Sequence, residues 1–154
     1  MENNNIDFEV IISTCDKFSD LWEANVLLLN KNWKARGNTY LVTDKETDIK
    51  LDGVKIVSAG EGVEITKRLE VALKKVQSKY ILFTLDDYFL TEPIDHNKLQ
   101  KTIHFMERES IDYVRLYSAT PRNLKLEGGG LWKRKPSYRE ELKTLFTVTS
   151  RTII

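Results

Sequence analysis

The pattern of apolar and polar residues predicts alternating strands and helices along most of the chain. Apolar or β-branched runs predict strands at residues 8–13, 39–43, 54–57, 80–85 and 112–117. Apolar residues at helical spacing predict a helix from near Ser19, a second over 65–76 and a third after Asp95. This order predicts an α/β fold whose mostly parallel, Rossmann-like sheet is flanked by helices.

Polar residues predict where the first and last helices begin. Asp20 and Glu23 fall in the first turn of the helix near Ser19, where acidic side chains suit the helix dipole. The apolar side of this helix is predicted from Leu21, Trp22, Ala24, Leu28 and Leu29. Asp95 is the predicted N-cap of a helix that carries Leu99, Ile103 and Met106 on one face.

Two adjacent carboxylates, Asp86 and Asp87, follow directly on the strand at 80–85. At the carboxyl end of a parallel strand they would lie at the edge of the sheet, where open α/β folds bind ligands. Neighbouring negative charges favour a counter-charge, commonly a divalent cation that often bridges to a phosphate. The same residues also suit a helix N-cap or a turn, and that alternative needs no ligand.

The composition after residue 117 is different. Residues 118–141 contain two prolines, three consecutive glycines and the basic residues Lys133, Arg134, Lys135 and Arg139. They predict a basic, flexible loop, which is either a solvated connection or a lid whose cations reach a diphosphate. Residues 142–154 predict a terminal strand, truncated soon after it forms, and a second copy could cover the unfinished sheet edge. We therefore expect one domain over 1–154 with its core at 6–117.

The overall composition is that of an ordinary globular protein, with 41% apolar and 31% charged residues. A net charge of +1 gives no global field toward nucleic acid or a membrane. Cys15 is the only cysteine, which excludes an internal disulfide and fits a reducing compartment. No apolar run is long enough to span a bilayer and no signal peptide is apparent. We expect a cytoplasmic protein, peripheral to a membrane at most through other proteins.

The segment 65–90, a helix followed by a strand that leads into two aspartates, resembles the nucleotide-sugar domain of GT-A glycosyltransferases. It looks most like the family 2 type of bacterial polysaccharide synthesis. Residues 10–16 are similar to the family's first strand and the loop that touches the nucleotide base. Asp44, at the end of the second strand, resembles the family's acid that contacts base or ribose. The resemblance covers roughly residues 6–117.

The resemblance implies transfer of a sugar from a nucleotide-diphosphate-sugar donor to a hydroxyl of a saccharide or lipid-linked acceptor. It implies that Asp86 and Asp87 hold Mg²⁺ or Mn²⁺ on the diphosphate, with Asp87 the more direct ligand, so that the metal stabilises charge on the departing nucleotide. The nucleotide-sugar-binding residues that it implies are Ser13, Thr14, Asp16, Asp44, Arg68 and Asp86. Two of these residues have alternative roles. Asp16 would alternatively cap the first helix, and Arg68 would alternatively be a solvent-exposed arginine of its helix.

The chain departs from the family in two ways. The family pattern is Asp-any-Asp or three acids in a row, whereas Leu85 and Tyr88 flank only two. Family members also continue into a half that binds the acceptor and, in inverting enzymes, supplies the catalytic carboxylate. The acidic residues in the later part of this chain, toward where that half would lie, are Glu127, Glu140 and Glu141. The sequence does not single one of them out, so we assign no catalytic residue.

Three other functions fit the same residues. A non-catalytic or truncated nucleotide-sugar-binding module would bind the donor with metal and transfer nothing. A receiver-like or phosphoryl-transfer domain would also use an acidic pair for Mg²⁺, but such proteins generally place the key acid after the first strand rather than the fourth. A plain scaffold would use its acids only as caps.

Overall fold

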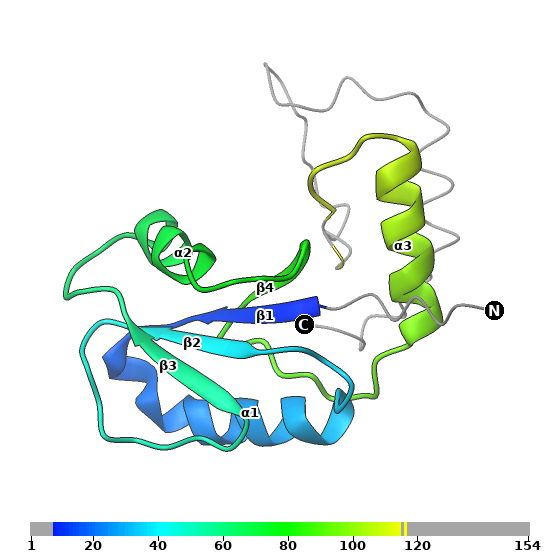
Figure 1. Ribbon diagram of the computed structural model, residues 1–154. Helices are drawn as coiled ribbons and strands as arrows, with labels where there is room; N and C mark the ends of the chain where they lie inside the picture. The colour runs from blue at the N-terminus through cyan, green and yellow to red at the C-terminus, as the bar shows by residue number, and fades with distance from the viewer. Residues whose placement is uncertain (1–7, 115, 117–154) are drawn as a thin grey trace, which may run out of the picture. The chain divides into compact units, whose positions relative to one another are not determined.

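The computed structural model describes residues 8–114 and 116, which fall into two compact units, one up to Ile94 and one from Asp95 (Figure 1). The strands of the first unit are β1 (Phe8–Ser13), β2 (Thr39–Thr43), β3 (Val54–Ser58) and β4 (Tyr80–Leu85). Its helices are the short 3-10 turn η1 (Asp16–Phe18), α1 (Ser19–Asn32) and α2 (Ile65–Leu73). The second unit contains α3 (His96–Arg108).

The four strands form one all-parallel sheet in the order β3-β2-β1-β4, which confirms the predicted Rossmann-like α/β fold. Figure 1 shows α1 along one face of this sheet and α2 on the opposite face. Right-handed crossovers require this arrangement, because the chain steps outward from β1 to β3 and then returns to the far side of β1. The strand order therefore reverses between β1 and β4, and such a switch point is where open α/β sheets bind ligands.

The core lies around the two central strands. Every residue of β1 and β2 is buried, as expected of parallel strands covered on both faces. Ile11, Val42 and Ala72 form a buried cluster where α2 packs on β1 and β2, and partly buried apolar residues such as Val76 pack against it. Trp22 and Trp33 are 2% and 1% exposed, so both tryptophans are packing residues.

The buried face of α1 differs from the predicted one. Trp22 and Leu29 are buried, but Ala24 is exposed, and Leu21 and Leu28 are only partly buried. The buried residues of α1 are Trp22, Asn25, Val26, Leu29 and Asn32. The prediction was wrong because it assigned the buried face to apolar residues alone, whereas two asparagines are buried with their amides hydrogen-bonded.

Two predicted elements have different limits in the structure. Helix α2 ends at Leu73 rather than at residue 76, although Val76 still packs on the core. Residues 112–114 and 116, the described part of the fifth predicted strand, lie in no strand. Tyr113 there is 61% exposed, and Val114 and Leu116 are only partly buried, so neither face of the expected strand is covered as a strand in a sheet core would be. The loop and strand predicted at 118–154 lie outside the described residues.

In the second unit, α3 begins as predicted. The side chain of Asp95 accepts a hydrogen bond from the Lys98 N–H at 3.1 Å, which makes Asp95 the N-cap. Leu99 and Ile103 are buried, whereas Met106 is only partly so. Among the described residues, no helix combines the length and the apolar character needed to cross a bilayer.

A buried carboxylate ties together the amino-terminal side of the sheet. Glu9 of β1 is 1% exposed, and its Oε2 accepts hydrogen bonds from the N–H groups of Gln77 and Ser78 at 2.6 and 3.0 Å. Its Oε1 accepts one from the Asn38 amide at 2.6 Å. Burial by itself raises the pKa of Glu9, but the hydrogen bonds together outweigh it and lower the pKa from 4.5 to about 2.

Glu9→Gln is expected to lower the free energy of unfolding at pH 7 by about 2–3 kcal/mol, because an amide has one acceptor oxygen. Its NH2 group would then face donors on one side, either the N–H groups of residues 77 and 78 or the Asn38 amide. The folded-state pKa is depressed, so the contribution of Glu9 is full above pH 4.5 and is lost as the pH falls toward 2. The difference between wild type and variant should therefore shrink between these values. Urea unfolding followed by circular dichroism measures it, with the exposed Glu46→Gln as control. Identical urea midpoints for the two variants at pH 7 would contradict this role of Glu9.

Candidate functional site

The carboxyl ends of β1, β2 and β4 bring the predicted site residues to one edge of the sheet. The strand register pairs Ser13 of β1 with Leu85 of β4 on one side and with Val42 of β2 on the other. Residues that follow these strands therefore meet at this edge, on either side of β1. Two clusters form there, one between β1 and β4 and one between β1 and β2.

The first cluster is centred on Asp86, which is 6% exposed. The Thr14 hydroxyl donates to Asp86 Oδ2 and accepts a hydrogen bond from Trp22 Nε1 at 2.8 Å. A hydroxyl has a single proton, and since the indole donates to Thr14, that proton is available for the carboxylate. Trp22 of α1 thus orients the Asp86 side chain through Thr14.

The two aspartates have different surroundings. The chain turns directly after β4, where the Tyr88 N–H donates to the Leu85 carbonyl at 3.2 Å. Asp86 lies buried in this turn, and Asp87 is exposed. The pair therefore occupies a turn, as one interpretation of the sequence allowed, and it presents one carboxylate to solvent at the switch point.

The second cluster joins the loops that follow β1 and β2. The Asp16 N–H donates to Asp44 Oδ2 at 3.2 Å, and the Asp44 N–H donates to Asp16 Oδ1 at 3.1 Å. The guanidinium of Arg68 in α2 pairs with Asp44 Oδ1 and also donates to the Val63 carbonyl at 3.2 Å. The two loops are thus joined reciprocally, and Arg68 balances one of the two negative charges.

The alternatives left open by the sequence can now be compared with these contacts. The Asp16 carboxylate accepts hydrogen bonds from Asp44 and Lys45 rather than capping α1, whose N-cap is Phe18. The Arg68 side chain is 12% exposed, so it is not a solvated helix arginine. Ser13, at the end of β1, is 4% exposed and lies beneath the edge rather than at its surface.

Sequence reasoning missed two residues of α1 that organise this edge, Trp22 as an orienting residue and Asn25. The Asn25 amide donates to the backbone carbonyls of Asp86 and Tyr88 at 2.9 and 3.1 Å. A signal for Asn25 was present, because it lies three residues after Trp22 and four before Leu29, the spacing of a single helix face.

The described residues contain no group of three or more His, Cys, Asp or Glu side chains placed to hold a metal ion. The adjacent carboxylates of Asp86 and Asp87 are the residues that could hold a metal here. Mg²⁺ keeps several waters and is commonly bound by one or two carboxylates together with substrate phosphates. The donor set therefore suits a cation that is shared with a phosphate ligand. The acids Glu127, Glu140 and Glu141 lie outside the described residues.

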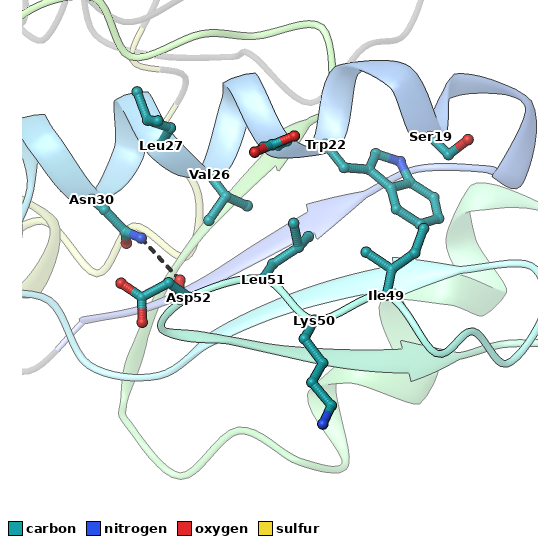
Figure 2. A pocket seen from close by; sticks show the side chains of 10 residues that line it. Ser19, Trp22, Val26, Leu27, Asn30, Ile49, Lys50, Leu51 and Asp52 are labelled. Atoms are coloured by element: carbon teal, nitrogen blue, oxygen red, sulfur yellow. Dashed lines mark hydrogen bonds between the residues drawn. The ribbon is translucent and has the colours of Figure 1, made fainter.

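An open groove of about 590 Å³ lies elsewhere in the first unit, between α1 and the loop that leads into β3. Figure 2 shows Leu27, Val26 and Trp22 on the helix side, with Ile49 and Leu51 opposite. The Asn30 amide donates to the Asp52 carbonyl at 2.9 Å across one end. Trp22 lines this groove while its N–H holds Thr14, but neither aspartate of the pair lines it.

Comparison with family models, with curated proteins and with solved structures gave no significant match. The class of protein is therefore defined by its fold, a Rossmann-like α/β domain with a four-stranded parallel sheet.

Thr14→Val should lower the free energy of unfolding by about 1–3 kcal/mol, because the isosteric change leaves both the Trp22 N–H and Asp86 Oδ2 without this partner. Thr14→Ser keeps the hydroxyl and should cost less. Urea unfolding monitored by tryptophan fluorescence compares the two variants with wild type. Equal stability of the serine and valine variants would show that the hydroxyl does not link Trp22 to Asp86.

Proposed function

We propose that this chain binds a nucleotide-diphosphate sugar at the carboxyl edge of its sheet and transfers the sugar to an acceptor hydroxyl. One observation carries the proposal. At the switch point between β1 and β4, a buried and hydrogen-bonded Asp86 stands next to an exposed Asp87. The resemblance of the sequence to GT-A glycosyltransferases supports the same function, with a saccharide or lipid-linked molecule as acceptor.

Each of the two clusters would contact a different part of the donor. Asp87, with the remaining oxygen of Asp86, would hold Mg²⁺ or Mn²⁺ on the diphosphate. The loops joined through Asp16 and Asp44 would face base and ribose, while Arg68 is close enough to Asp44 to hold that carboxylate in place. When bound, the metal would supply Lewis-acid stabilisation of the departing nucleotide diphosphate.

Transfer also requires a group that accepts the proton of the attacking hydroxyl. No described residue is assigned to that role. The proposal therefore separates into donor binding, which the edge of the sheet supports, and transfer, for which the base is unassigned. A module that binds the donor without transfer is the alternative, and it would use the same two clusters.

A thermal-shift panel tests donor binding. Nucleotide diphosphates and nucleotide sugars, each with and without Mn²⁺, should include at least one ligand that raises the melting temperature only with metal, by mass action on the folded state. Asp87→Ala should abolish that shift and leave the unliganded melting temperature nearly unchanged, because the side chain is exposed. The exposed Asp48→Ala is the matched control.

Equal metal-dependent shifts in wild type and Asp87→Ala would refute the assigned site, and no shift with any member of the panel would refute donor binding. The assay that separates the enzyme from the module measures release of nucleotide diphosphate from the donor that binds. Binding without release, with and without saccharide acceptors, would favour the module.

A further inference from the structure

We infer that Asn25 of α1 is a positioning residue for the acid pair, because it holds the backbone of the turn that carries Asp86 and Asp87. The ligand named in the test rests on the function proposed above. The two hydrogen bonds from Asn25 to this turn, called the clamp below, are observed independently of that function.

The Asn25 side chain is well placed for this role. It is 3% exposed, and its Nδ2 lies 2.9 Å from the carbonyl oxygen of Asp86 and 3.1 Å from that of Tyr88. A primary amide has two protons, so one nitrogen can serve both carbonyls. These carbonyls flank Asp87, and the clamp therefore fixes the backbone on both sides of the exposed carboxylate.

A second asparagine of the same helix extends the contact. Asn32 Nδ2 donates to the Leu90 carbonyl at 2.6 Å, and the Asn32 carbonyl accepts from the Ile94 N–H at 3.1 Å. The two amides thus bind the carbonyls of the alternate residues 86, 88 and 90 along the segment that follows β4.

Asp86 is thus held from α1 at both ends. Trp22 reaches its carboxylate through Thr14, and Asn25 reaches its backbone carbonyl directly. Partners that orient ligating carboxylates in this way contribute strongly to metal affinity, although they do not touch the metal. The exposed Asp87 is left as the carboxylate that faces a ligand, at a position set by the clamp.

Asn25→Leu and Asn32→Leu in the full chain separate positioning from general stability, because each removes a buried amide from the same helix face. Both should lower the melting temperature. The affinity for Mn²⁺ with uridine diphosphate or with guanosine diphosphate, followed by water-proton relaxation well below that temperature, should fall roughly 10–100-fold in Asn25→Leu only. Hydrogen exchange of the Tyr88 amide should accelerate in Asn25→Leu and remain near wild type in Asn32→Leu.

Equal losses of affinity in both variants, or unchanged Tyr88 exchange in Asn25→Leu, would overturn the inference. If wild type binds Mn²⁺ with neither diphosphate, the proposed function fails for these donors, and Tyr88 exchange alone then decides whether Asn25 holds the turn. Should the leucine variants not fold, Asn25→Ser and Asn32→Ser, which shorten the donors, replace them in the same two measurements.

Discussion

The carboxylate of Glu9 is the constraint on which the arrangement of the sheet depends. Placing a charge in the core is unfavourable unless hydrogen bonds compensate it, and here backbone and side-chain donors do so. Two of these donors, at residues 77 and 78, lie immediately before β4. They thus fix where β4 begins against β1. Since the strands are of equal length in this register, the same contact places Asp86 beside Thr14 at the opposite edge.

Helix α1 holds the chain that follows β4 at two places. Its carboxyl-terminal half holds the segment after β4 through Asn32, and its amino-terminal half holds the acid pair through Trp22 and Asn25. An apolar helix face would bury the same area without specifying where the chain runs after β4. Buried amides specify it, because an unmatched carbonyl or amide in the interior is unfavourable. The polar residues of α1 therefore contribute to the shape of the site rather than to burial alone.

The sequence was sufficient for much of the fold, for identifiable reasons. Strands β1 and β2 are buried on both faces, and their apolar and β-branched runs predicted them with nearly correct limits. β4 was predicted from the same kind of run, although it is an edge strand whose residues are only partly buried, with Phe83 exposed. The place of Asp86 and Asp87 at the carboxyl end of β4 was predicted because they directly follow such a run. The sequence did not show that Asp16 and Asp44 hydrogen-bond reciprocally, since that contact joins loops 28 residues apart. The buried face of α1 was also mispredicted, because hydrophobicity does not reveal a polar residue that is satisfied in the interior.

The unequal surroundings of Asp86 and Asp87 limit the chemistry available at the switch point. One carboxylate is committed in part to Thr14, and the other is exposed, so the protein alone offers few oxygens to a cation. Under the proposed function, a cation held by so few protein ligands would need additional oxygens, and the diphosphate of the donor would supply them on binding. Metal and donor would then bind together rather than in sequence. A site of this kind would need accurate placement of its few carboxylates. Helix α1 contributes to it through Trp22 and Thr14 for the Asp86 side chain, and through Asn25 for the backbone carbonyls of Asp86 and Tyr88.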